Sequence, residues 1–110
     1  MRNFGNRPNF GRFASLGCMY WLVKYDVVDH YIERREAYRP QHLAVVREAH
    51  DAGFLVLGGA LADPPDGAYI LFTSDDVAPV EKWVREDPYV INGLVTNWTI
   101  RNWTIGVGAP

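Results

Sequence analysis

Residues 38–53, YRPQHLAVVREAHDAG, predict a helix with both ends marked, and the other elements are best understood in relation to it. Pro40 suits the first helical turn, where the missing backbone N–H has no partner to lose. Gly53 suits the position after the last turn, which requires a positive φ. At 100° per residue the apolar side chains fall on one side of this helix and the charges on the other. His42 lies within the apolar arc, so its imidazole needs a polar partner inside the fold.

Composition limits the class of protein. The 110 residues are enough for one domain with a sizeable core, and 48 % apolar residues indicate a globular chain. A formal net charge of −2 argues against a nucleic-acid-binding surface, which normally carries a basic excess. No apolar run approaches the roughly 18 residues of a membrane span. The single cysteine, Cys18, fits a reducing compartment. We therefore expect a cytoplasmic protein without nucleic-acid or membrane partners.

Residues 1–18 differ from the rest, because they contain arginine, glycine, asparagine and proline but no acid. We expect a basic, poorly ordered N-terminal extension, or a start codon assigned upstream of Met19, followed by one domain over residues 19–110. A mitochondrial presequence is the alternative. It is less favoured because Ser15 is the only hydroxyl residue and glycine and proline oppose an amphipathic helix.

The remaining elements follow the order strand, helix, strand, strand, helix, strand. The second helix begins after a cap within residues 74–76 and ends at Asp87–Pro88, because a residue before proline avoids the helical region. Residues 29–37 also have helical character and are able to extend the first helix. The expected strands are residues 19–28, 54–57 (ended by Gly58–Gly59), 68–73 and roughly 94–105 with a bulge near Arg101–Asn102.

This order predicts an α+β fold on the ferredoxin-like βαββαβ plan, a four-stranded antiparallel sheet with two helices on one face. The strands carry apolar residues on both faces; in the first strand Trp21 and Val23 alternate with Tyr20 and Leu22. Two helices cover only one face, so the other face needs a second layer. The same sheet of a second subunit is the simplest layer, and we expect a homodimer that pairs through the open sheet face.

Topology supplies a partner for His42. In this plan the two helices run antiparallel, so the start of the first and the end of the second lie at the same end of the sheet. Asp87 ends the second helix and projects from its apolar side, and strand direction brings Tyr25 and Gly59 to the same end. A carboxylate bonded to one imidazole nitrogen fixes the tautomer and makes the other nitrogen more basic, as a general base requires. A structural His–Asp pair that locks two helix ends is the alternative.

Other polar and aromatic residues are weaker candidates. Arg39 is a candidate anchor for an anionic substrate oxygen, or a solvent-facing residue at the helix start. Tyr89 and Trp98 are candidates for the lining of a pocket, although packing is the commoner role for such aromatics. His30 and His50 are expected at the surface. The sequence contains no metal-ligand spacing and no glycine-rich phosphate loop, so we expect neither a metal nor an organic cofactor.

Three motifs together resemble the YCII-related (YciI-like) family over about residues 19–107. They are Arg39-Pro40-x-His42-Leu43, Gly58-Gly59-Ala60-Leu61 and Asp87-Pro88-Tyr89-Val90-x-x-Gly93-Leu94. The resemblance implies a ferredoxin-like dimer of the dimeric α+β barrel class, with a His–Asp pair as active site that corresponds to His42 and Asp87. The chain departs from the family in Gly58-Gly59-Ala60, where many members have Gly-Pro, and in its basic extension.

The resemblance also implies a range of activities. A few relatives are linked to dehalogenation-type elimination on chlorinated hydroxyquinols, and the wider superfamily includes cofactor-free monooxygenases and lactone isomerases. The leading hypothesis is a small cofactor-independent enzyme of lyase or isomerase type that acts on a small cyclic or aromatic molecule. In it His42 is the base and Asp87 orients it. The alternative is a non-catalytic homodimer that binds a small ligand at the same end of the fold.

Overall fold

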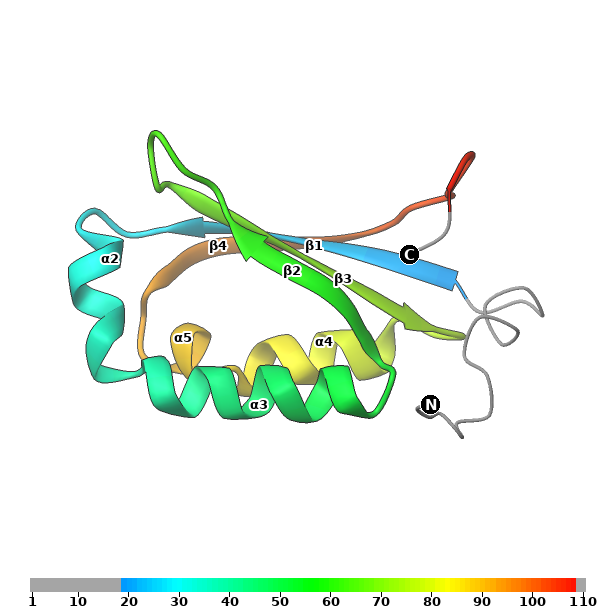
Figure 1. Ribbon diagram of the computed structural model, residues 1–110, viewed down its shortest axis with the longest axis horizontal. Helices are drawn as coiled ribbons and strands as arrows, with labels where there is room; N and C mark the ends of the chain where they lie inside the picture. The colour runs from blue at the N-terminus through cyan, green and yellow to red at the C-terminus, as the bar shows by residue number, and fades with distance from the viewer. Residues whose placement is uncertain (1–18, 109–110) are drawn as a thin grey trace.

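The computed structural model describes residues 19–108, in which a four-stranded antiparallel sheet lies over helices on one of its faces (Figure 1). The strand order is β2-β3-β1-β4, so the predicted α+β ferredoxin-like fold is confirmed. The predictions made for residues 1–18 lie outside the described residues. The elements are β1 (Met19–Val27), α2 (Tyr31–Arg34), the 3-10 helix η1 (Arg35–Ala37), α3 (Arg39–Asp51), β2 (Leu55–Ala60), β3 (Gly67–Ser74), α4 (Ala78–Glu86), α5 (Pro88–Ile91) and β4 (Val95–Asn102).

Helix α3 has the ends that its sequence predicts. Pro40 stands in the first turn, and Gly53 follows the last turn with φ of +79°. The segment before it is helical, as expected, but does not extend α3. It forms the separate α2 and η1, and Tyr38 caps α3 with φ of −118°. Pro40 explains the break, because it has no N–H to donate to the carbonyl four residues back.

Strand β2 is longer than predicted, because it continues through both glycines to Ala60. Gly58 pairs with Ile70 of β3 and Gly59 pairs with Tyr69. A Cβ atom on Gly58 would lie 3.4 Å from the Ile70 side chain and 3.4 Å from the Tyr69 carbonyl oxygen. The pairing of β2 with β3 shifts register between Leu55 and Leu57, and Gly58 beyond it marks a close approach within the strand rather than its end.

The last strand is shorter than predicted, since β4 ends at Asn102. The irregularity in its pairing with β1 lies between Asp26 and Val27 and not near Arg101–Asn102, where the ladder is regular. No bulge is needed there, because simple alternation puts Trp103 on the opposite face from Trp98. A short helix, α5, also follows α4 where the sequence indicated only a connection.

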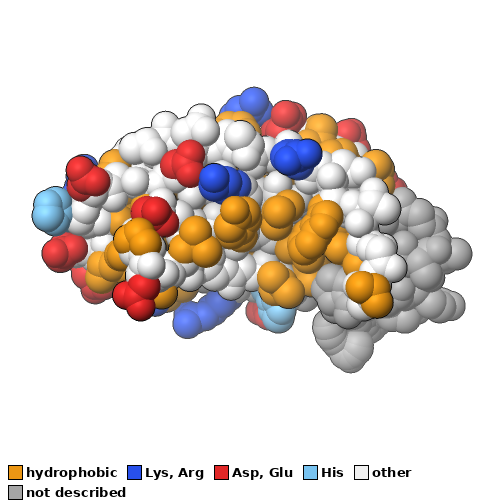
Figure 2. Space-filling model, turned by 90° about the horizontal axis from the view of Figure 1, so that it is seen from above, with side chains coloured by type: hydrophobic (Ala, Val, Ile, Leu, Met, Phe, Trp, Pro, Cys, Tyr) orange, Lys and Arg blue, Asp and Glu red, His pale blue; other side chains and the backbone are white. Residues whose placement is uncertain are grey.

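The two faces of the sheet have different surroundings. On the helix-covered face, Val23 and Phe72 pack with Val80 and Val84 of α4 in the buried core. On the other face, shown in Figure 2, apolar side chains gather along the middle of the sheet. We call it the open face; its apolar groove is lined by Leu57, Leu71, Trp103, Ile105 and Val107. No helix among residues 19–108 is long and apolar enough to cross a membrane.

Candidate active site

Asp87 joins α4 to α5, and its position follows from the Asp-Pro sequence. The residue before Pro88 takes extended backbone angles, φ of −64° and ψ of 125°, which end α4. The same residue caps α5, since its Oδ1 accepts a hydrogen bond from the backbone N–H of Tyr89 at 3.0 Å. Its side chain is fully buried. A carboxylate is thereby held inside the fold in one orientation.

Two further side chains bond to this carboxylate. His42 of α3 lies with Nδ1 2.7 Å from Oδ1, and the Tyr25 hydroxyl of β1 donates to Oδ2 at 2.7 Å. An ionised carboxylate only accepts hydrogen bonds, so Nδ1 of His42 is the donor in this pair, and the neutral form of the ring has its lone pair on Nε2. Burial, followed by the negative charge of Asp87 and the hydrogen bond to it, raises the pKa of Tyr25. Tyr25 is therefore a neutral donor across the ordinary pH range.

Aromatic rings hold the imidazole in place from one side. The ring of Tyr89 stacks on His42 with centroids 3.7 Å apart and planes at 7°. Tyr31 in turn meets Tyr89 edge-on, with centroids 5.9 Å apart and planes at 84°. The imidazole thus has its plane fixed by stacking and its rotation fixed by the bond to Asp87.

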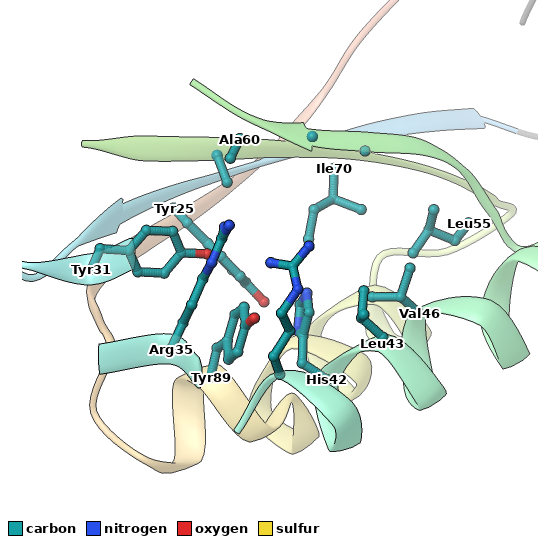
Figure 3. A pocket seen from close by; sticks show the side chains of 14 residues that line it. Tyr25, Tyr31, Arg35, His42, Leu43, Val46, Leu55, Ala60, Ile70 and Tyr89 are labelled. Carbon is teal, nitrogen blue, oxygen red and sulfur yellow. The ribbon is translucent and has the colours of Figure 1, made fainter. Parts of the chain in front are cut away.

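His42 faces a cavity of about 380 Å³ between the helices and the sheet (Figure 3). This volume lies within the range usual for small-molecule sites. The side chain of His42 is 15 % exposed and that of Asp87 is 0 % exposed, so the imidazole is reachable while its partner lies behind it. The lining residues are Tyr25, Tyr31, Arg35, Arg39, His42, Leu43, Val46, Leu55, Gly58, Gly59, Ala60, Ala68, Ile70 and Tyr89.

The two sides of the cavity differ in chemistry. Apart from Tyr25, whose hydroxyl is bonded to Asp87, the sheet side is apolar or bare backbone, from Gly58 through Ala60 and from Ile70. The helix side carries two cations, Arg35 and Arg39, and among residues 19–108 neither forms an ion pair with a carboxylate. The cavity therefore combines a flat apolar wall with positive charge, which suits a planar ring that carries anionic oxygen.

Most of the predicted site residues come together. His42, Tyr25, Arg39, Gly59 and Tyr89 line the cavity, and Asp87 lies directly behind His42. The predicted surface positions of His30 and His50 are confirmed, since both are exposed.

Trp98 is the one predicted site residue that neither lines this cavity nor bonds to a residue that lines it. It packs against the core from β4, and the Arg85 guanidinium lies 5.8 Å from the centroid of its ring. Trp98 therefore has the packing role that the sequence analysis gave as its alternative.

Sequence reasoning missed Tyr31 and Arg35. The guanidinium carbon of Arg35 lies 5.3 Å from the centroid of the Tyr31 ring, and both side chains line the cavity. The four-residue spacing of Arg35 and Arg39 was the available signal, because it places both on one side of a helix. Among residues 19–108 no group of three or more His, Cys, Asp or Glu side chains is placed to hold a metal ion.

The fold and the site together define the class: a small α+β protein with a ferredoxin-like sheet, whose cavity is lined by a histidine bonded to a buried aspartate. More particularly, the chain belongs to the YCII-related domain family, whose model matches residues 18–104. The resemblance inferred from the three sequence motifs is therefore confirmed. No curated protein matches the chain.

Solved structures with the same fold have low sequence identity to this chain. A 5-chloro-2-hydroxyhydroquinone dehydrochlorinase from Burkholderia phenoliruptrix AC1100, in complex with 2,5-dihydroxybenzoquinone, has a TM-score of 0.69 and 18% identity, over 80% of this chain and 96% of that one. A monooxygenase-like protein of antibiotic biosynthesis from Bacteroides thetaiotaomicron has a TM-score of 0.56 and 14% identity, over 84% of this chain and 93% of that one. A NIPSNAP-like domain protein from Burkholderia xenovorans has a TM-score of 0.54 and 14% identity, over 86% of this chain and 90% of that one. At these identities the likeness shows the fold.

Proposed function

We propose that the protein is a small cofactor-independent enzyme that uses His42 and Asp87 for general acid/base chemistry on a small cyclic or aromatic molecule. One observation carries the proposal: the 2.7 Å bond between His42 Nδ1 and a fully buried carboxylate, with the imidazole facing a cavity of about 380 Å³. A base needs a fixed tautomer and a free nitrogen within reach of its substrate. The geometry at His42 supports both requirements.

In the proposed reaction His42 Nε2 accepts the proton of an acidic hydroxyl on the ring. The imidazolium that forms lies against the Asp87 carboxylate, which offsets its charge. Tyr25 and the Tyr89 backbone N–H hold that carboxylate still, so little reorganisation is needed when the proton moves. His42 then returns the proton to a ring carbon, or to the departing group.

Elimination or isomerisation is the reaction type that this chemistry favours. The dehydrochlorinase from Burkholderia phenoliruptrix AC1100, which shares the fold, supports an elimination on a chlorinated hydroxyhydroquinone. In that elimination two hydroxyl protons leave the ring and one returns to the carbon that bears chlorine. Chloride then departs with the electron pair of its bond, so that a hydroxyquinone and hydrogen chloride result. His42 accepts the two protons in turn, returns one of them to the carbon that bears chlorine and passes the other to solvent, and no oxidant or reductant is consumed.

The proposal includes a homodimer that pairs through the open face. The side chain of Leu57 is 56 % exposed there, and Trp103 and Val107 are exposed beside it. Exposed apolar surface of this kind is typical of association sites. A second copy has the same apolar groove and satisfies the symmetry of a twofold pair.

The test begins with a binding screen of phenols, quinones and lactones by thermal stabilisation, with 2,5-dihydroxybenzoquinone and 5-chloro-2-hydroxyhydroquinone among them. Compounds that bind are then incubated with the protein without oxygen, and chloride release and ring absorbance are recorded. We expect His42→Ala to lower the rate by about 10²-fold or more while the protein stays folded. His50→Ala, an exposed histidine of the same helix, is the matched control and should retain the rate.

Two results would contradict the proposal. Turnover that survives His42→Ala would show that another group is the base. Compounds that bind tightly at the cavity, with none of them converted, would establish the alternative of a non-catalytic ligand-binding protein.

A further inference from the structure

The cavity contains a second set of polar groups besides the His–Asp pair. The Tyr89 hydroxyl and the Arg35 Nε are both buried, and neither has a hydrogen-bond partner among residues 19–108. Arg39 lines the same cavity. Buried polar groups in folded proteins nearly always have a partner, because a buried donor without one loses its hydrogen bond to water and gains nothing in return. Buried donors that face a cavity and have no partner therefore indicate a ligand atom that accepts their hydrogen bonds.

The Tyr89 hydroxyl is unable to reach water by moving aside. The residue is only 2 % exposed, its backbone N–H is bonded to Asp87, and its ring is packed between His42 and Tyr31. Figure 3 shows its hydroxyl directed into the cavity from the helix side, next to Arg35. The hydroxyl is therefore held facing the cavity, where the Arg39 guanidinium beside it and a molecule inside the cavity are its available partners.

The charge of the cavity indicates what that molecule carries. Two arginines line the cavity and no Asp or Glu of residues 19–108 does, because Asp87 is covered by His42. Burial raises the pKa of Tyr89, against the opposing effect of Arg35 and Arg39, so the phenol is a neutral donor at neutral pH. Guanidinium groups and a phenol O–H together match an anionic oxygen.

We propose that Arg35, Arg39 and the Tyr89 hydroxyl form an oxyanion subsite, which holds an ionised oxygen of the substrate other than the hydroxyl that meets His42. The substrate class is then a hydroxylated aromatic or quinoid ring with a second, negatively charged oxygen, either a carboxylate or an ionised ring hydroxyl. The assignment of the other hydroxyl to His42 rests on the proposed function; the subsite itself does not.

Tyr89 connects the two parts of the cavity. One face of its ring lies on His42, while its hydroxyl belongs to the subsite. A ring held by its anionic oxygen at the subsite is thereby placed beside the imidazole rather than at random in the cavity. The subsite would select the substrate and the dyad would carry out the proton transfer.

Isothermal titration of the full chain near neutral pH tests the subsite with three ring compounds of similar size. Hydroquinone is neutral, 2,5-dihydroxybenzoate carries a carboxylate, and 2,5-dihydroxybenzoquinone carries ionised ring oxygens. We expect one or both anions to bind about tenfold or more tightly than hydroquinone. The two anionic arms distinguish a carboxylate from a ring oxygen as the group recognised.

Variants then locate the effect. Arg35→Gln, Arg39→Gln and Tyr89→Phe should each weaken binding of the preferred anion, by about tenfold for the arginines, and leave hydroquinone binding unchanged. Arg34→Gln is the matched control: it removes the same charge from an exposed position on α2 and should bind like the wild type. If a variant does not fold, the comparison of hydroquinone with the two anions on the wild-type protein still tests the subsite.

Equal binding of hydroquinone and both anions, or no binding of any of them, overturns the subsite. So does an equal loss in Arg34→Gln and Arg35→Gln, which would reflect net charge alone. Turnover separates the two proposals. If the subsite fails while His42→Ala still abolishes turnover, the proposed function stands; if turnover survives His42→Ala while Arg35→Gln loses the anion, only the subsite stands.

Discussion

The ring of Tyr89 lies flat on the imidazole of His42, with centroids 3.7 Å apart and planes at 7°. The backbone N–H of the same tyrosine donates to Asp87 Oδ1 at 3.0 Å. One residue of the short helix α5 thus positions both members of the His–Asp pair. This helix is as much a part of the site as the two longer helices.

Replacement of Tyr89 separates its ring from its hydroxyl. Tyr89→Phe keeps the stack on His42, so turnover at saturating substrate should stay near that of the wild type. Tyr89→Leu removes the stack and frees the imidazole, so kcat should fall by about tenfold. Steady-state kinetics on a compound that the protein converts measures both, and equal kcat values for the two variants would show that the stack has no part in positioning His42.

Asp87→Asn keeps the shape of the side chain but changes its hydrogen bonding. The amide oxygen keeps the place of Oδ1, which accepts from both His42 and the Tyr89 backbone N–H, and the NH₂ faces the Tyr25 hydroxyl. The variant lacks the negative charge that stabilises the imidazolium, so we expect kcat to fall by about 10²- to 10⁴-fold. Loss of the carboxylate should lower the free energy of unfolding by about 1–3 kcal/mol. Kinetics and urea unfolding on the same preparation compare the two effects, and a stability loss with unchanged kcat would instead establish a structural pair.

Tyr25→Phe removes only the hydroxyl that donates to Asp87 Oδ2 at 2.7 Å. The buried carboxylate loses one of its donors, and the free energy of unfolding should fall by about 1–3 kcal/mol. Tyr69→Phe is the control, because Tyr69 lies on the open face and is exposed. Urea unfolding of both variants measures the difference, and equal stabilities would mean that the Tyr25 bond contributes nothing.

Alkaline pH should destabilise the protein through Tyr25. Burial, with the charge of Asp87, raises its pKa in the folded state above the ordinary value of 10.0. Below that value both folded and unfolded chains hold the proton, and the stability is fully present. Above it the unfolded chain loses the proton first, so stability falls by up to about 1.4 kcal/mol per pH unit from this residue. Urea unfolding from about pH 9 to 11 should show the fall, and a shallower one in Tyr25→Phe.

The homodimer is tested at the open face. Sedimentation equilibrium at micromolar concentration should give the mass of a dimer for the wild type. Leu57→Glu puts a charge into the apolar groove and should give a folded monomer. Ile91→Glu is the matched control: Ile91 is 64 % exposed on α5, away from that face. A monomeric wild type, or a monomer from Ile91→Glu alone, would contradict pairing through the sheet.

The sequence by itself determined the elements whose cause is local. Pro40 and Gly53 set the ends of α3, and the Asp87–Pro88 pair ended α4, because each residue restricts its own backbone angles. Alternation in the first strand separated Trp21 and Val23 from Tyr20 and Leu22, but both sets are apolar, so it did not tell which face the helices cover. The meeting of His42 with Asp87 was also predictable, since the βαββαβ order brings those two helix ends together and each residue interrupts an apolar face.

Only the tertiary structure decided the composition of the cavity. Tyr31 lines it from α2 and meets Tyr89 of α5 edge-on, and Arg35 lines it from η1, a docking of separate short elements that the sequence read as one helical segment. β2 runs on through Gly58 because β3 supplies its hydrogen bonds, although glycine alone disfavours a strand. Trp98 lies away from the cavity because β4 is at the opposite edge of the sheet from β2, and the strand residues that line the cavity come from β1, β2 and β3. Such contacts join segments far apart in the chain, and their energies depend on how the elements dock.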